Sequence, residues 1–161
     1  MITMNNAELA KEYFRKAYNC QIVGKNSEAI INYKLSIQLS PSAEAYTFLG
    51  FVYGLEGRYE DAIAQCKIAI ELDKDLGNPY SDIGFYLMKL GDFQNSVEWF
   101  NKAIKASRYD ERYKPYFYLG KISEKRCDLI KAANYFKDCL RLKPDYLPAK
   151  QEFYRVVASM N

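Results

Sequence analysis

Few residues of this chain could do covalent, acid-base or metal chemistry. It has four cysteines and no histidine in 161 residues. Without histidine, the sequence excludes catalytic dyads and triads built on imidazole and every metal site that needs histidine. Cys20, Cys66, Cys127 and Cys139 include no C-x-x-C pair, so they form neither a zinc motif nor a redox motif. We expect them to pack as small apolar groups in a reducing compartment, with no metal and no cofactor.

The other requirements of an active site are not met either. No nucleophile stands beside a base, and no glycine-rich loop could cradle a phosphate. The adjacent acids Glu60 and Asp61 are explained by a helix that begins there, because negative charge in a first turn is favoured by the helix dipole. The sequence therefore predicts that the protein is not an enzyme.

The composition is that of a water-soluble chain with one domain, residues 1–161. Apolar residues make up 49% and the net charge is only +3, which is too small to indicate nucleic-acid binding by itself. Residues 105–150 hold 12 basic and 6 acidic residues, but the signs alternate and no RNA-binding signature accompanies them. Residues 1–6 have neither a basic run nor an apolar stretch, unlike a secretory signal. We expect a cytoplasmic protein that does not enter a membrane, with RNA binding only as a minor alternative.

An internal repeat organises the chain. Three columns of small residues and one of tyrosine all advance by steps of 33, 34 and 36 residues. The columns are Ala17, Gly50, Gly84 and Gly120; Ala29, Ala62, Ser96 and Ala132; Ser36, Ala69, Ala103 and Cys139; and Tyr13, Tyr46, Tyr80 and Tyr116. Such regular steps predict one supersecondary unit repeated four times.

Each unit is predicted to contain two helices joined by a turn. Within residues 46–53 and 62–70, small and apolar side chains recur at offsets of three and four, which is the period of a helix. A left-handed residue is expected between the two helices, and the four residues at that place are Gly24, Gly57, Gly91 and Cys127. The small columns let paired backbones approach closely, so a bulky side chain there would overpack the contact.

The units are separated by helix breakers. Before the third unit, we expect Asn78 to cap the next helix and Pro79 to open it. Two extra residues, within 108–112, precede the fourth unit and leave its angle to the third unit open.

The second unit shows a family resemblance. Its pattern Tyr46-x-x-Leu49-Gly50-x-x-Tyr53, followed by Ala62, Ala69 and Leu72, resembles the signature of the tetratricopeptide repeat. The first unit departs from it, because Lys16 and Ala17 replace the usual Leu-Gly. The resemblance implies an all-α, right-handed superhelical solenoid of four helix-turn-helix repeats, with the first helix of each lining a concave groove. We place the repeats at residues 10–42, 43–76, 77–112 and 113–146.

Residues 147–160 are predicted to form a capping helix. Phe153, Val157 and Met160 share one helical face that could cover the open side of the fourth repeat. Tyr154 occupies the column that elsewhere holds Gly or Ala. A bulky residue is tolerable there if no second helix follows, so the stack is expected to end here.

The first helices carry a second apolar face, which is the candidate binding site. In the second unit, Phe48, Phe51 and Leu55 lie about 180° from the packing residues at about 100° per residue. Contiguous apolar patches on a soluble protein usually mark binding sites. The alternative is that a tight superhelix, or residues 1–9, fills the groove from within. The predicted groove residues are Phe14, Tyr18, Phe48, Phe51, Asp82, Phe85, Lys114, Phe117, Tyr118 and Lys121.

Charges give the groove a predicted direction. Lys114, Lys121 and Lys125 flank its fourth-repeat end, whereas Glu44 and Asp82 lie near its middle. A ligand with an acidic end would place that end toward the lysines, although a plain solvated lysine face explains them equally well.

One function within the family can be tested on the sequence. The subset that captures heat-shock chaperone tails holds their carboxylates with a clamp of Lys, Asn and Arg. One alignment places Phe14, Tyr18, Phe48, Asn78 and Asp82 at the clamp positions, and the next places Thr47, Phe51, Asp82, Lys114 and Tyr118 there. Neither set forms the clamp, and Asp82 would repel an acidic tail. The sequence therefore argues against that role.

These observations predict a non-catalytic adaptor that binds a peptide or helix of another protein in an aromatic groove. A self-associating scaffold, or a chaperone resembling those of secretion and pilus assembly, is the alternative. We expect a monomer or a weak homodimer.

Overall fold

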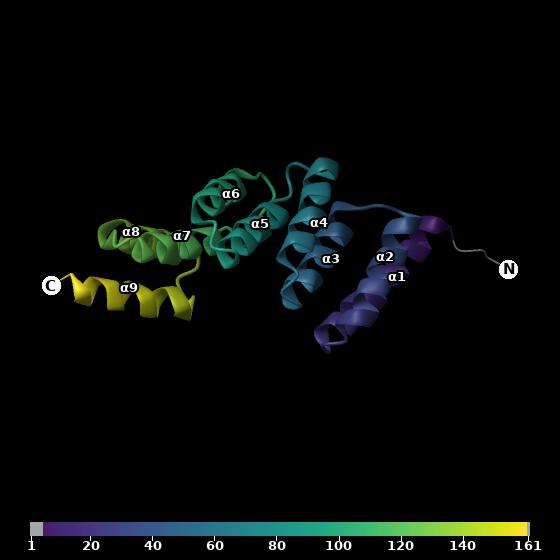
Figure 1. Ribbon diagram of the computed structural model, residues 1–161, viewed down its shortest axis with the longest axis horizontal. Coiled ribbons are helices and arrows are strands. Elements are labelled where there is room, and N and C mark those ends of the chain that lie inside the picture. Colours follow the sequence, from purple (N-terminus) through teal and green to yellow (C-terminus); the bar gives the residue numbers. More distant parts are fainter. Residues whose placement is uncertain (1–4, 161) are drawn as a thin grey trace.

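A computed structural model describes residues 5–160, which form nine α-helices and no β-strand. The helices are α1 (Asn6–Ile22), α2 (Asn26–Leu39), α3 (Ala43–Leu55), α4 (Tyr59–Leu72), α5 (Asn78–Lys89), α6 (Phe93–Lys105), α7 (Tyr113–Lys125), α8 (Leu129–Leu142) and α9 (Leu147–Ser159). Successive helices pack in antiparallel pairs, and each pair packs against the next, so the molecule is an elongated stack with α1 and α2 at one end and α9 at the other (Figure 1). No helix within this part of the chain is long and apolar enough to cross a membrane.

The small columns lie where paired helices touch. Ala29, Ala62, Ser96 and Ala132 are fully buried. A Cβ atom added at Gly84 would lie 2.8 Å from the ring of Phe100, and one at Gly120 would lie 2.5 Å from the ring of Phe136. Contacts this close exclude any side chain at the two glycines, so the repeated small residues follow from the helix spacing.

The turn positions have the predicted left-handed backbone. Gly24, Gly57 and Gly91 have φ angles of 75°, 74° and 85°. Cys127 has a φ of 60° and is the only non-glycine residue with a positive φ in the described chain. No atom lies within 4 Å of a Cβ built on these glycines, so the backbone conformation, rather than space, favours glycine there.

The start of α5 differs from the sequence expectation. Pro79 lies in the first turn as predicted, but Gly77 is the N-cap and Asn78 is already helical, without a capping hydrogen bond from its side chain. The loop between α6 and α7 holds the first residue of this cap in place, because the Gly77 amide donates to the Arg108 carbonyl at 2.9 Å. Tyr109 packs on Gly77 so closely that an added Cβ would lie 2.4 Å away.

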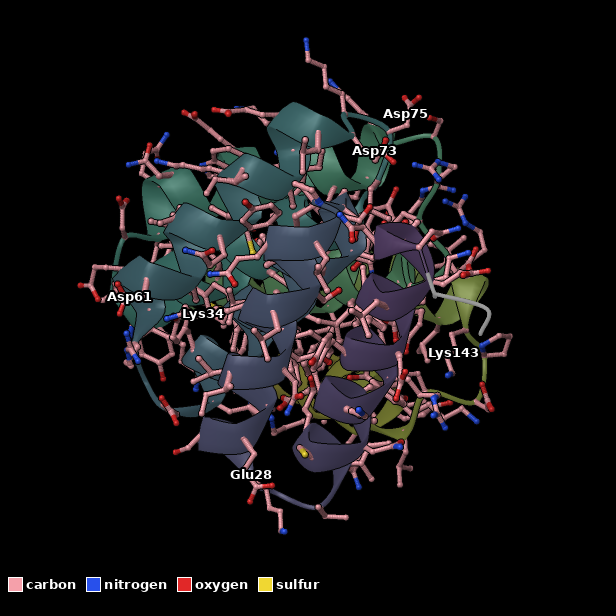
Figure 2. All side chains as sticks on the ribbon, turned by 90° about the vertical axis from the view of Figure 1, so that its right-hand side faces the viewer. Glu28, Lys34, Asp61, Asp73, Asp75 and Lys143 are labelled. Carbon is pink, nitrogen blue, oxygen red and sulfur yellow. The ribbon has the colours of Figure 1, made fainter. Side chains whose placement is uncertain are left out.

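The extra residues before α7 dock onto the loop after α4. Ser107 donates a hydrogen bond to Asp75 at 2.8 Å, and Arg108 forms an ion pair with Asp73. Viewed along the stack from the α1 end, Asp73 and Asp75 lie close together at its outer edge (Figure 2). Tyr109 is only 6% exposed. The buried Tyr109 side chain of the insertion therefore packs the loop between α6 and α7 onto the loop between α4 and α5.

The last helix covers α7 and α8, but one of the three residues predicted on its buried face is different. Phe153 and Val157 pack against the buried cluster around Phe136, as expected, and Val156 is fully buried there. Met160, predicted on the same face, follows the end of α9 and is 46% exposed. Val156 takes the central position instead because α9 presents the side between Phe153 and Val157. Tyr154 is 68% exposed, as a column position facing no further helix should be.

Candidate functional site

The first helices of the pairs, α1, α3, α5 and α7, carry the predicted groove residues, and two cavities open among them. The first cavity has a volume of about 350 Å³. Its aromatic walls are Tyr18 from α1 and Phe48 and Phe51 from α3, and Asp82 from α5 also lines it. Tyr18 and Phe51 are each 41% exposed, so their rings are accessible to a ligand.

The second cavity lies further along the stack, with a volume of about 530 Å³. Phe85 and Met88 from α5 form one wall, and Phe117 and Tyr118 from α7 form the other. Phe93 at the start of α6 and Ile122 of α7 add to the apolar lining. The charged lining residues are Lys89, Lys121, Glu124 and Lys125. Asp82 and Phe85 are three residues apart on α5, so one helical turn separates the two cavities.

The aromatic row also takes part in the packing between repeats. Phe14 makes edge-on contacts with Tyr33 at 5.4 Å and Phe48 at 5.3 Å between ring centroids, and it lines neither cavity. Phe85 contacts Tyr118 at 5.2 Å. The sequence predicted rings on a face that the stack leaves free. In the structure, Phe14, Phe48, Phe85 and Tyr118 also pack between repeats, whereas Phe51 stays accessible.

The described part of residues 1–9 does not fill this groove. Residues 6–9 form the first turns of α1, where Asn5 and Glu8 form a capping box. Residues 1–4, which the filled-groove alternative also involves, lie outside the described residues.

Asp82 lies in an unusual electrostatic environment. Among the described residues, no hydrogen bond or ion pair involves its carboxylate. Burial raises the pKa of Asp82 to about 7, an effect that nearby Lys114 opposes and Glu111 reinforces. The titratable groups around it are Tyr86 on the same helix, Cys66 from α4, Tyr109 and Glu111 from the loop before α7, and Lys114 and Tyr118 from α7.

Two of the three lysines predicted at one end of the groove form ion pairs within the chain. Lys114 pairs with Glu111 at 2.6 Å. Lys121 pairs with Glu124 at 3.3 Å and with Glu152 of α9 at 2.9 Å. The charges of Lys114 and Lys121 are therefore balanced within the chain. Lys125, the third lysine of the prediction, lies over the Phe93 ring at 4.6 Å and lines the second cavity. Attraction of an acidic ligand end stays a prediction that now rests on Lys125.

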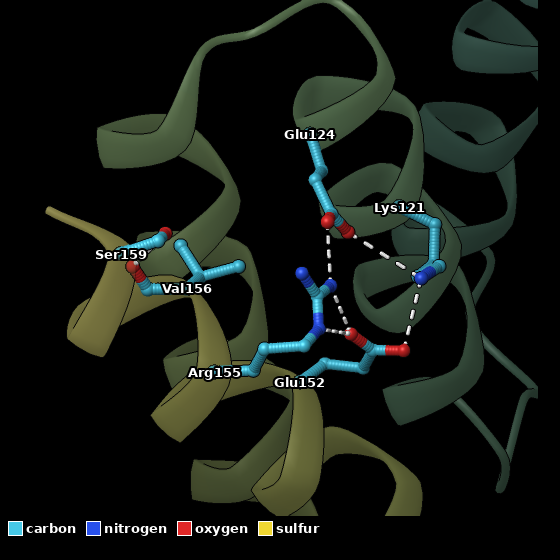
Figure 3. Close-up of polar contacts among 6 residues, drawn as sticks. All are labelled: Lys121, Glu124, Glu152, Arg155, Val156 and Ser159. Atoms are coloured by element: carbon cyan, nitrogen blue, oxygen red, sulfur yellow. Dashed lines mark hydrogen bonds and ion pairs between the residues drawn. The ribbon is translucent and has the colours of Figure 1, made fainter.

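Lys121 belongs to a four-residue ion-pair network that joins α7 to α9. Arg155 reaches both Glu124 and Glu152, and Lys121 completes the ring of contacts (Figure 3). Burial opposes ionisation of Glu152, but hydrogen bonds from Lys121 and Arg155 outweigh it and lower the pKa of this carboxyl. Sequence reasoning missed this network, since no local pattern relates residues 121 and 152.

Polar residues also line the first cavity. The sequence placed Glu44 in the groove and Asn78 at a clamp position, and both line this cavity; it missed Gln21, which follows Tyr18 by one turn. The i, i+3 and i, i+4 spacing that assigned the aromatic residues places these polar ones on the same face.

Two of the repeats match a known family model in sequence. Residues 43–76 and 78–110 match the family model of the tetratricopeptide repeat. The match covers the second and third helix pairs, so the sequence likeness to this family rests on those two repeats. The chain is 28% identical over 106 residues to the small glutamine-rich tetratricopeptide repeat-containing protein 2 of Mycosarcoma maydis, which corresponds to 65% of this chain and 29% of that protein.

Solved tetratricopeptide-repeat structures share the fold. PilF of Pseudomonas aeruginosa has a TM-score of 0.88 and 19% identity, over 96% of this chain and 70% of that one. The first repeat domain of Spaghetti (RPAP3), bound to the HSP90 peptide SRMEEVD, has a TM-score of 0.67 and 20% identity, over 75% of this chain and 94% of that one. At this identity the likeness concerns the fold, an all-α repeat solenoid.

Proposed function

We propose that this protein is a non-catalytic adaptor that binds a segment of another protein along α1, α3, α5 and α7. The observation that carries the proposal is the pair of cavities whose accessible aromatic walls lie on that face. Large accessible aromatic side chains in concave sites are typical anchors in protein recognition. A solved relative of this fold holds a peptide, which supports a polypeptide as the ligand class.

The proposed ligand differs from that peptide in charge. The HSP90 peptide SRMEEVD carries a run of acidic residues. In this chain, Glu44 and Asp82 line the first cavity, and Lys114 and Lys121 are paired with glutamates. An acidic segment would meet repulsion there, so we do not extend the chaperone-tail role to this protein.

The test is selection of binders from a random-peptide display library with the full chain as bait. Selected peptides are then measured against Phe51→Ala, which removes an accessible ring from the first cavity. Ile130→Ala is the matched control, because Ile130 is 68% exposed on α8 and lines neither cavity. We expect affinity to fall about tenfold or more for Phe51→Ala alone. The proposed binding groove would be wrong if no peptide were selected, or if Phe51→Ala and Ile130→Ala bound the selected peptides with equal affinity.

We further propose that the chain acts in the cytoplasm as a monomer or weak homodimer. Its four cysteines are all unpaired, which fits a reducing compartment. Light scattering at several concentrations tests the oligomeric state. A mass that stays at that of one chain favours a foreign ligand, whereas growth into larger assemblies would favour the self-associating scaffold.

A further inference from the structure

The first cavity has an excess of negative charge. Four charged residues line it: Glu44, Asp82, Glu111 and Lys114. The ion pair between Lys114 and Glu111 removes one charge of each sign. Glu44 and Asp82 remain, and no ion pair balances either of them among residues 5–160. The nearby cation Arg108 is occupied by Asp73.

Asp82 has no hydrogen bond or ion pair to its carboxylate within the described chain. A carboxylate partly withdrawn from water is stabilised by a direct cationic partner, and here Lys114 acts on it only as a nearby charge. Lys114 lines the same cavity, yet its ammonium group is held by Glu111. A ligand cation would supply the missing partner.

The walls of the cavity suit a long basic side chain. Tyr18, Phe48 and Phe51 offer aromatic surface beside the carboxylates. Lysine and arginine bury an alkyl stem along apolar surface and keep a charged head, which can also lie over an aromatic ring. On the basis of the function proposed above, we propose that the first cavity binds a lysine or arginine side chain of a partner polypeptide, with Asp82 and Glu44 receiving its charge.

The second cavity extends this recognition to a two-residue pattern. Phe85, Met88, Phe117 and Tyr118 give it apolar walls, with charged side chains also among its lining residues, and it begins one turn along α5 from Asp82. The partner's basic residue therefore stands near a large apolar residue, which occupies the space between Phe85 and Tyr118. A basic residue without an apolar neighbour would fill only half of the groove.

The experiment measures full-length protein against an array of 12-residue peptides of random sequence. Binders are expected to be enriched in lysine or arginine at a fixed spacing from an aromatic or large aliphatic residue. For the strongest binder, replacing that basic residue with norleucine or citrulline should lower affinity about tenfold.

Two variants of the protein separate the carboxylate from net charge. Asp82→Asn should lower affinity for the basic peptide about tenfold, and Asp145→Asn, which removes the same charge at an exposed position outside both cavities, should leave it unchanged. Thermal melting confirms that both variants are folded. Affinity for the wild type should rise from pH 6 to pH 8, as Asp82 ionises, and Asp82→Asn should lose this rise.

The results distinguish this inference from the function on which it rests. Absence of any binder overturns both. Binders that depend on Phe51 but show no basic residue, or that bind Asp82→Asn as well as wild type, retain the adaptor and overturn the basic-residue site. Self-association of the wild type that Asp82→Asn abolishes would assign the cavity to a second copy of the chain and overturn the foreign partner.

Discussion

Tyr109 packs against Gly77 across the loops that join the second, third and fourth helix pairs, leaving no room for a side chain at residue 77. The exposed ion pair between Asp73 and Arg108 lies beside this contact. We expect Tyr109→Ala to lower the free energy of unfolding by about 3 kcal/mol, because it empties a buried aromatic site. Arg108→Ala should change it little, since exposed ion pairs contribute weakly. Urea denaturation of the two variants measures the difference; equal effects would place the anchor in the ion pair.

Cys127 is strained relative to the glycines at the equivalent turns. Its φ of 60° is a conformation that glycine adopts without a Cβ penalty. Cys127→Gly should therefore raise the free energy of unfolding by about 1 kcal/mol. The converse variant Gly57→Ala should lower it by a similar amount. A Cys127→Gly protein that unfolds at lower urea concentration than wild type would contradict this reasoning.

Ala62 tests the helix spacing. It is fully buried, and its carbonyl would lie 3.0 Å from a Cβ at Gly50. Ala62→Leu should destabilise the protein by roughly 1 to 3 kcal/mol through overpacking. Ala64→Leu on the exposed side of the same helix is the control and should be nearly neutral. Unchanged melting of Ala62→Leu would show that the two helices do not require a small residue there.

Phe51 and Phe85 should separate binding from stability. Phe51 is 41% exposed and belongs to none of the buried clusters, whereas Phe85 packs against two of them. Phe51→Ala is expected to weaken ligand affinity with little change in melting temperature. Phe85→Ala should reduce both, with a loss of stability of about 2 kcal/mol. Calorimetric melting alongside peptide titration provides the two readouts.

The ionisation of Asp82 should make stability depend on pH. Because its pKa is about 7 in the folded chain and 3.8 without the environment, the folded state holds the proton more tightly. Stability is therefore lost as pH rises from about 4 to about 7. Asp82→Asn should remove this loss, raising the free energy of unfolding by about 1 to 2 kcal/mol at pH 8 and by less at pH 5; partial exposure keeps the gain modest. Urea denaturation at both pH values tests the sign.

The sequence sufficed for the helices, the turns and the small columns because these depend on local spacing and size. Gly84 and Gly120 had to be small wherever the paired helices met. The sequence could not show that Phe14 and Phe85 pack between repeats. An aromatic ring at helical spacing fits a binding groove and a helix interface equally well. Nor could it show that Lys121 meets Glu152, since that contact depends on where α9 settles.

The placement of α9 has a consequence for the groove that this helix does not line. Glu152 and Glu124 hold the ammonium group of Lys121, which borders the second cavity. Removing the final helix would take away Glu152 and Arg155 together, leave Lys121 paired with Glu124 alone, and expose α8. A truncated chain would then hold Lys121 less firmly beside the second cavity, so the terminal helix orders part of the recognition surface as well as covering α8.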